Sequence, residues 1–161
     1  MEIAISNRQR TKKVNVRWLQ KITLALLSDL KLTDAELGIH LVGSREMARV
    51  NWQFLRHEGS TDVITFDHLA ADSAPPTAKG RLHGELFICM DDAVAQATEF
   101  QTTWQSEVVR YGVHGVLHLL GHDDVRPGLR RKMKRQENRL LRRLEQRFSF
   151  ADLARVARIS A

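Results

Sequence analysis

Four short stretches of the chain carry the alternating or continuously apolar pattern that predicts β-strands. EIAIS near the N-terminus alternates, and TDVITFDHLA at 61–70 is rich in β-branched residues. LGIHLVG at 37–43 and HGELFICM at 83–90 are similar short apolar runs. We therefore expect four strands.

Other stretches repeat apolar residues every three or four positions, which predicts amphipathic helices. The helix at 105–120 is apolar around much of its circumference, so we expect it to be central and buried. Residues 70–82, with two prolines and a glycine, predict a loop. Helices and strands follow one another without strict βαβ alternation, so the expected fold class is α+β. The predicted helices cover residues 14–30, 44–55, 91–101, 105–120 and 127–147.

Length and composition favour one domain over residues 1–161, ending in a basic helix at 127–147 and a tail at 148–161. The 43% of hydrophobic and 27% of charged residues exclude a disordered chain. No apolar run reaches the roughly 18 residues that span a bilayer, so we expect no membrane association. The N-terminus lacks a signal-peptide pattern, and the single cysteine, Cys89, lies in an apolar run. These features predict a cytoplasmic protein with a buried thiol.

The sequence HGVLHLLGHDD, residues 114–124, predicts a metal site at the end of the central helix. His114 and His118 lie one helical turn apart on one face, so both imidazoles can reach one ion at about 2.0–2.1 Å. Two unpaired imidazoles on so apolar a helix would be costly to bury. Gly115 stands where HExxH proteases carry their glutamate base, which argues against a metalloprotease.

The third ligand is open between His122 and Asp124. In an unbroken helix, His114 and His122 would lie about 12 Å apart along the axis, too far to share an ion. Gly121 is suited to end the helix, so a residue beyond it can turn back. Geometry therefore favours Asp124, whose carboxylate is an acceptable zinc ligand. Asp123 is expected to cap, to form a turn or to support a histidine.

The same motif resembles the signature of the YbeY endoribonuclease family, the bacterial rRNA maturation factors. That signature has two helical histidines, a glycine, and a third histidine six residues after the second. Two more segments are similar to the family: NWQFLRHEGSTDVITF, with Thr61 and Asp62, and HGELFICM, with Gly84 and Glu85. The resemblance covers residues 36–145, and the combination is more specific than any one piece.

The resemblance implies an α+β fold with a small mixed four-stranded sheet packed with about five helices. It implies one zinc ion in a cleft, held by His114, His118 and Asp124. The implied activity is zinc-dependent cleavage of single-stranded RNA, in late maturation of the 16S rRNA 3′ end and in ribosome quality control. RNA and the small ribosomal subunit are then the partners. The alternative is a non-catalytic assembly factor that binds RNA and holds a structural metal.

Two positions depart from the family pattern. Asp124 replaces a histidine, and an anionic ligand weakens the Lewis acidity of the metal. It also opens the site to divalent ions other than zinc. Many family members carry an arginine seven residues before the aspartate of the Thr-Asp pair. That position is Leu55 here, with Arg56 beside it.

The catalytic candidates follow from what phosphodiester cleavage requires. Arg56 and His57 are candidates for neutralising the charge that develops on the phosphate. The general base is open among Glu85, Asp62 and a hydroxide ion at the metal. The nucleophile, water or the RNA 2′-hydroxyl, is also open.

A net charge of +6 and an isoelectric point near 10.0 favour a polyanionic partner. Much of the charge falls on the helix at 127–147, whose predicted apolar stripe is Leu129, Met133, Leu140 and Leu144. A solvated helix face is the simpler interpretation, but like charges four residues apart oppose each other unless an anion relieves them. With NRQRTKK at 7–13, the helix is a candidate phosphate-binding surface. Its basic residues include Arg130, Arg131, Lys132, Lys134, Arg135, Arg139, Arg142 and Arg143, against only Glu137 and Glu145.

Overall fold

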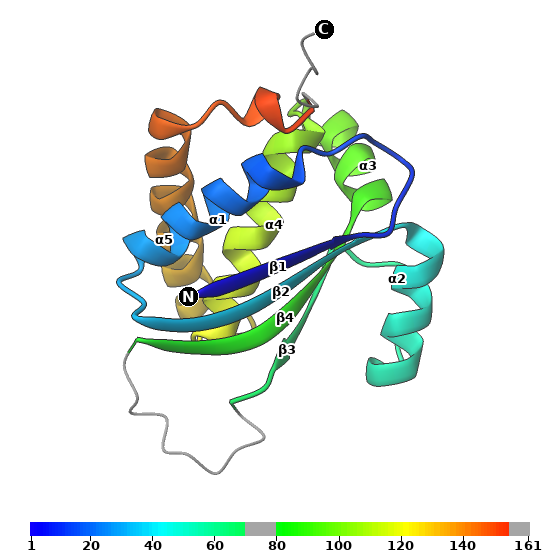
Figure 1. Ribbon diagram of the computed structural model, residues 1–161. Helices are drawn as coiled ribbons and strands as arrows, with labels where there is room; N and C mark the ends of the chain where they lie inside the picture. The colour runs from blue at the N-terminus through cyan, green and yellow to red at the C-terminus, as the bar shows by residue number, and fades with distance from the viewer. Residues whose placement is uncertain (70–79, 155–161) are drawn as a thin grey trace, which may run out of the picture.

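A mixed four-stranded sheet forms the centre of the computed structural model, which describes residues 1–69 and 80–154 (Figure 1). The strands are β1 (Glu2–Asn7), β2 (Asp34–Val42), β3 (Val63–Asp67) and β4 (Arg81–Cys89). Their order is β1-β2-β4-β3, with β1 and β4 parallel to β2 and β3 antiparallel to β4. The four predicted strands and the α+β class are therefore confirmed.

The described residues contain five α-helices, close to the predicted positions. The predicted helix at 44–55 divides into an α-helix and a π-helical turn, η1, and part of the tail forms a 3₁₀ turn, η2. Residues 70–79 of the predicted loop and 155–161 of the predicted tail lie outside the described residues. The elements are α1 (Val16–Asp29), α2 (Ser44–Val50), η1 (Asn51–Leu55), α3 (Met90–Phe100), α4 (Trp104–Leu119), α5 (Pro127–Arg147) and η2 (Phe150–Ala154).

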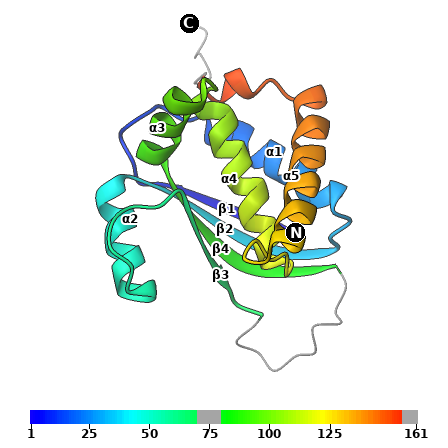
Figure 2. The same cartoon turned by 180° about the vertical axis from the view of Figure 1, so that it is seen from behind.

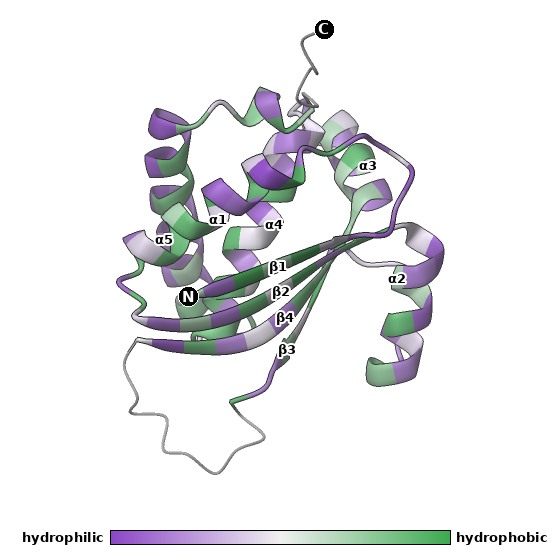
Figure 3. Ribbon diagram, viewed as in Figure 1, coloured by the Kyte–Doolittle hydropathy of each residue, from purple (hydrophilic) through white to green (hydrophobic). Residues whose placement is uncertain are grey.

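The helices are distributed unequally over the two faces of the sheet. Helices α1 and α4 lie against one face and α5 packs on them, whereas α2 lies on the other side at one end (Figures 1 and 2). Buried and more exposed residues alternate along β2 and β4, and Figure 3 shows hydrophobic and hydrophilic residues along the same strands. The main core thus lies between the sheet and α1, α4 and α5. Helix α4 is at its centre, as its apolar circumference predicts.

Cys89 is buried in a smaller cluster beneath α2, together with Met47 and Ile64. Burial raises the pKa of its thiol, so Cys89 is a packing residue as predicted. None of the helices within the described residues is long and apolar enough to cross a membrane.

Two glycines allow α4 to approach β4 closely. A Cβ atom on Gly115 would meet Leu86 Cδ2 at 2.7 Å. On Gly84, a Cβ atom would lie 2.6 Å from the carbonyl oxygen of Phe66 and 2.9 Å from the side chain of Leu119. These close approaches fix the height of the histidine helix above the sheet.

We expect Gly84→Ala to lower the free energy of unfolding by about 2 kcal/mol, because the new methyl group meets a backbone oxygen that cannot move away. The matched control is Gly112→Ala on α4, where a Cβ atom would meet nothing within 4 Å. That change should be neutral or stabilise by about 1 kcal/mol, through helix propensity. Urea unfolding followed by circular dichroism measures both, and equal effects would contradict the close packing at Gly84.

Candidate metal centre

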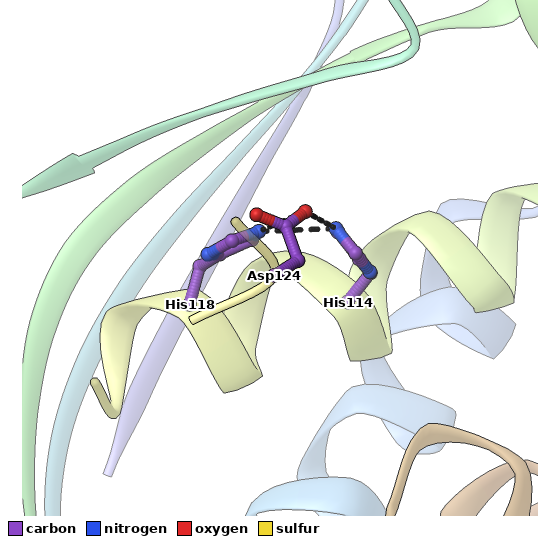
Figure 4. A group of neighbouring side chains, drawn as sticks. All are labelled: His114, His118 and Asp124. Carbon is purple, nitrogen blue, oxygen red and sulfur yellow. Dashed lines mark hydrogen bonds and ion pairs between the residues drawn. The ribbon is translucent and has the colours of Figure 1, made fainter. Parts of the chain in front are cut away.

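The end of α4 turns the chain back toward its own histidines. Gly121 has φ +95°, the left-handed conformation that ends many helices. Its N–H donates to the carbonyl of His118 at 3.0 Å, and the N–H of His122 donates to the carbonyl of Leu117 at 3.0 Å. This pair of bonds is a Schellman motif. The loop that follows carries Asp124 back beside the helix, as Figure 4 shows.

Three side-chain atoms converge on one point (Figure 4). The Nε2 atoms of His114 and His118 lie 3.1 Å apart. Asp124 Oδ2 lies 3.3 Å from Nε2 of His118 and 3.6 Å from Nε2 of His114. Ligand atoms that hold a tetrahedral ion at 2.0–2.1 Å are themselves about 3.3–3.4 Å apart. The triangle therefore has the size that a zinc-like ion requires.

Asp124, and not His122, joins the two histidines. Among the described residues, His114, His118 and Asp124 are the one group of three or more such side chains whose ligand atoms lie within 4.8 Å of one another. Asp123 accepts a hydrogen bond from the N–H of Val125 at 2.7 Å, so it stabilises the turn.

Glu137 on α5 contacts the imidazole of His114 at Nδ1, the nitrogen that does not face the metal triangle. Its Oε1 lies 2.9 Å from Nδ1 of His114, and its carboxylate also accepts from Arg110 at 2.9 Å and Lys134 at 3.0 Å. Burial by itself would raise the pKa of Glu137, but the bonds from His114 and Lys134 outweigh it and lower the pKa to about 2. An ionised carboxylate only accepts, so Nδ1 of His114 carries the proton and Nε2 is free to bind a metal.

Glu137 was not among the sequence-predicted site residues. The signal that identifies it is its position, four residues after Met133 and three before Leu140, on the buried side of α5. An acid on an apolar stripe needs a partner inside the protein. The prediction that Leu129 belongs to the same apolar stripe is wrong. Its side chain is 40% exposed, because the buried stripe of α5 begins one turn later, at Met133.

Two cavities adjoin the metal triangle, whose side chains are 28–41% exposed. The cavity on the β3 side has a volume of about 380 Å³ and is lined by Asn51, His57 and Thr65, among others. A second cavity of about 510 Å³ lies on the α3–α5 side. Asp62 and His114 line both cavities. The candidate metal site is therefore open to a ligand from two sides.

A family model described as Endoribonuclease YbeY matches residues 4–145. The chain belongs to this family. An Endoribonuclease YbeY from Myxococcus xanthus is 39% identical over 117 residues, which are 73% of this chain and 39% of that protein. The YbeY protein of Syntrophotalea carbinolica is 32% identical over 148 residues, 91% of this chain and 97% of that protein. The solution structure of TM1509 from Thermotoga maritima shares the fold, with a TM-score of 0.63 and 20% identity over 99% of both chains.

Of the catalytic candidates predicted from the sequence, His57 lines the β3-side cavity that adjoins the metal triangle. Asp62 also lines this cavity, whereas Arg56 does not. Arg56 has φ +55°, and its guanidinium lies 5.4 Å from the centre of the Trp52 ring. The left-handed backbone at the end of η1 thus directs this cation to the indole.

Glu85 lies on the opposite face of the sheet from the metal triangle. Its neighbours on β4, Gly84 and Leu86, face α4, so strand alternation turns Glu85 away. There it bonds His40 at 2.7 Å and His68 at 2.9 Å, and these bonds, chiefly that from His40, lower its pKa despite partial burial. Glu85 is therefore no part of the cleft.

The basic side chains of α5 divide into paired and unpaired groups. Arg143 and Arg147 pair with Asp29 at 3.5 Å and 2.7 Å, and Lys134 pairs with Glu137. The remaining exposed cations make no ion pair with any described residue, so they present uncompensated charge to the solvent. These unpaired cations include Arg131, Lys132, Arg135 and Arg142.

Proposed function

We propose that this chain is a metal-dependent endoribonuclease that cuts single-stranded RNA, with zinc as the metal. The observation that carries the proposal is the metal triangle of His114, His118 and Asp124, opening into two cavities. The relatives named endoribonucleases support the reaction class. We place the activity in the cytoplasm, in maturation of the 16S rRNA 3′ end and in ribosome quality control on the small subunit.

An open coordination position favours catalysis over a structural metal. Structural zinc sites are closed by four protein ligands, whereas catalytic sites use three and leave a position for water or substrate. Here the described residues supply three donors, all partly exposed. A bound divalent ion would polarise the phosphoryl oxygen or activate a water. The anionic Asp124 also makes divalent ions other than zinc acceptable in the same triangle.

The other residues of the cleft act on the phosphate and the proton. His57, in its protonated form, would neutralise negative charge that develops on the phosphate. We assign to Asp62, which lines both cavities, the role of accepting a proton from the attacking hydroxyl group. Glu137 keeps His114 in the tautomer that binds the metal.

Cleavage of a labelled single-stranded RNA and of its duplex by the purified, metal-loaded protein tests the proposal. We expect the wild type to cut the single strand, and His114→Ala to cut it at background level while remaining folded by circular dichroism. Equal cleavage by both proteins would identify a contaminating nuclease. That outcome would favour the alternative, an RNA-binding assembly factor with a structural metal.

Neutralising the unpaired cations of α5 is expected to weaken RNA binding without changing metal content. A plot of log affinity against log salt has a negative slope. In the triple variant Arg131→Gln, Arg135→Gln, Arg142→Gln, the magnitude of this slope should decrease by about 0.7 for each lost phosphate contact. Arg45→Gln on α2 removes an exposed charge elsewhere and is the matched control. A fluorescence anisotropy titration at several salt concentrations measures the slope. An unchanged slope in the triple variant would exclude this surface from RNA binding.

A further inference from the structure

The larger cavity beside the metal triangle has a volume of about 510 Å³, and the mechanism above uses only the part of its wall next to the triangle. Residues from the end of α3, from α4 and from the first half of α5 line it, and Figure 2 shows how these three helices are arranged. His114 and Asp124 form part of its wall, so whatever occupies it lies next to the reacting phosphate. Ligand sites typically have volumes of about 300–1,000 Å³, so one nucleotide fits and a base-paired duplex does not.

An exposed aromatic ring stands in the wall of this cavity. Phe100, the last residue of α3, is 60% exposed, more than any other phenylalanine, tyrosine or tryptophan that the structure describes. Gln101 follows with φ +56°, which ends the helix and leaves the ring at the surface. Unpaired bases of single-stranded RNA stack on such aromatic rings, whatever their sequence.

Two cations of α5 face the same cavity. Arg130 donates to the backbone carbonyls of Asp124 at 2.8 Å and Val125 at 3.3 Å, so its guanidinium is held over the loop of the metal triangle. The side chain of Lys134 is 59% exposed although it pairs with Glu137. Both line the cavity and can contact a phosphate group.

A buried polar group completes the cavity wall. Tyr111 on α4 lines the cavity and is 4% exposed, and its hydroxyl has no hydrogen-bond partner among the described residues. Buried polar groups are nearly always hydrogen-bonded, so the Tyr111 hydroxyl is an unused donor next to the cavity. Gln96, which also lines the cavity, adds an amide that can pair with the edge of a base.

We propose that this cavity binds the nucleotide adjacent to the scissile phosphate, with its base stacked on Phe100 and a phosphate between Arg130 and Lys134. The inference rests on the proposed function, because the metal triangle defines which phosphate is scissile. It supplies a reason for single-strand specificity, since a base inside a duplex is already paired and stacked and cannot enter the cavity.

The test measures binding of a cleavage-resistant single-stranded RNA, with 2′-O-methyl riboses and phosphorothioate linkages, to the metal-loaded full chain. We expect Phe100→Ala to weaken binding about tenfold, within the range of base–aromatic stacking. Phe100→Tyr, which keeps the ring, should retain most of the affinity. Phe54→Ala is the matched control, because Phe54 is 56% exposed but belongs to η1 and does not line the cavity. Metal content should be the same in all four proteins.

A second measurement identifies the base. In a set of RNAs that each lack one base, we expect one position to weaken wild-type binding as much as Phe100→Ala does. That position should have no further effect in the variant. Unchanged binding by Phe100→Ala, or additive losses at every position, would overturn the proposal.

The two proposals fail separately. If the wild type cleaves RNA and Phe100→Ala binds RNA as the wild type does, the proposed endoribonuclease activity is supported and the proposed base-binding site is contradicted. If removal of one base has no further effect in Phe100→Ala, and the wild type does not cleave ordinary RNA, the base-binding site is supported and the endoribonuclease activity is contradicted.

Discussion

His118→Ala is expected to abolish stoichiometric zinc binding, and Asp124→Ala is expected to do the same. Loss of a residue that only orients a ligand weakens metal affinity about 10–100-fold, so loss of a ligand should exceed that range. The reason is geometric: each side chain supplies one corner of a triangle with edges of 3.1, 3.3 and 3.6 Å. With only two protein donors left, water molecules would have to supply the other ligands of the ion.

The matched control for both variants is His122→Ala, because His122 lies in the same loop and has the same side chain as a ligand. It lies outside the metal triangle, so its replacement should leave metal content unchanged. Elemental analysis of the purified proteins and competition with a chromophoric chelator measure content and affinity. Loss of zinc in His122→Ala with retention in Asp124→Ala would reverse the assignment of the third ligand.

Glu137→Gln is expected to weaken zinc binding about 10–100-fold and to lower the free energy of unfolding by about 2 kcal/mol. Glu137 is 2% exposed and accepts from His114, Lys134 and Arg110, so a neutral amide leaves these donors without their anion. Glu145→Gln is the matched control on the same helix, because Glu145 is exposed. Equal effects of the two changes would contradict the orienting role of Glu137.

The stability difference caused by Glu137→Gln should depend on pH in the metal-free protein. Glu137 has its pKa lowered from 4.5 to about 2 in the folded chain, so it binds a proton less readily than in the unfolded chain. Its contribution is complete above pH 4.5 and disappears as the pH falls toward 2. The unfolding free energies of wild type and variant should converge over this interval. A constant difference would assign the effect to packing instead of charge.

Local sequence determined much of the fold and part of the metal site. The spacing of His114 and His118 is a property of one helix, and Gly121 ends that helix through its own backbone conformation. The return of Asp124 follows from this turn within a few residues. Strand alternation is equally local, which is why the four strands were predictable from their side-chain pattern.

Only the tertiary structure decided which distant residues join the site. Glu137 reaches His114 across 23 positions of sequence, through the packing of α5 on α4. The alternation of side chains along β4 shows that Glu85 and Leu86 point to opposite faces of the sheet. Only the placement of α4 decides which of these faces holds the cleft. The cavity at Phe100 likewise exists because α3, α4 and α5 meet. The periodicity of apolar residues determines which side of a helix or strand is buried. Which other helix or strand packs against that side depends on long-range contacts that no single segment encodes.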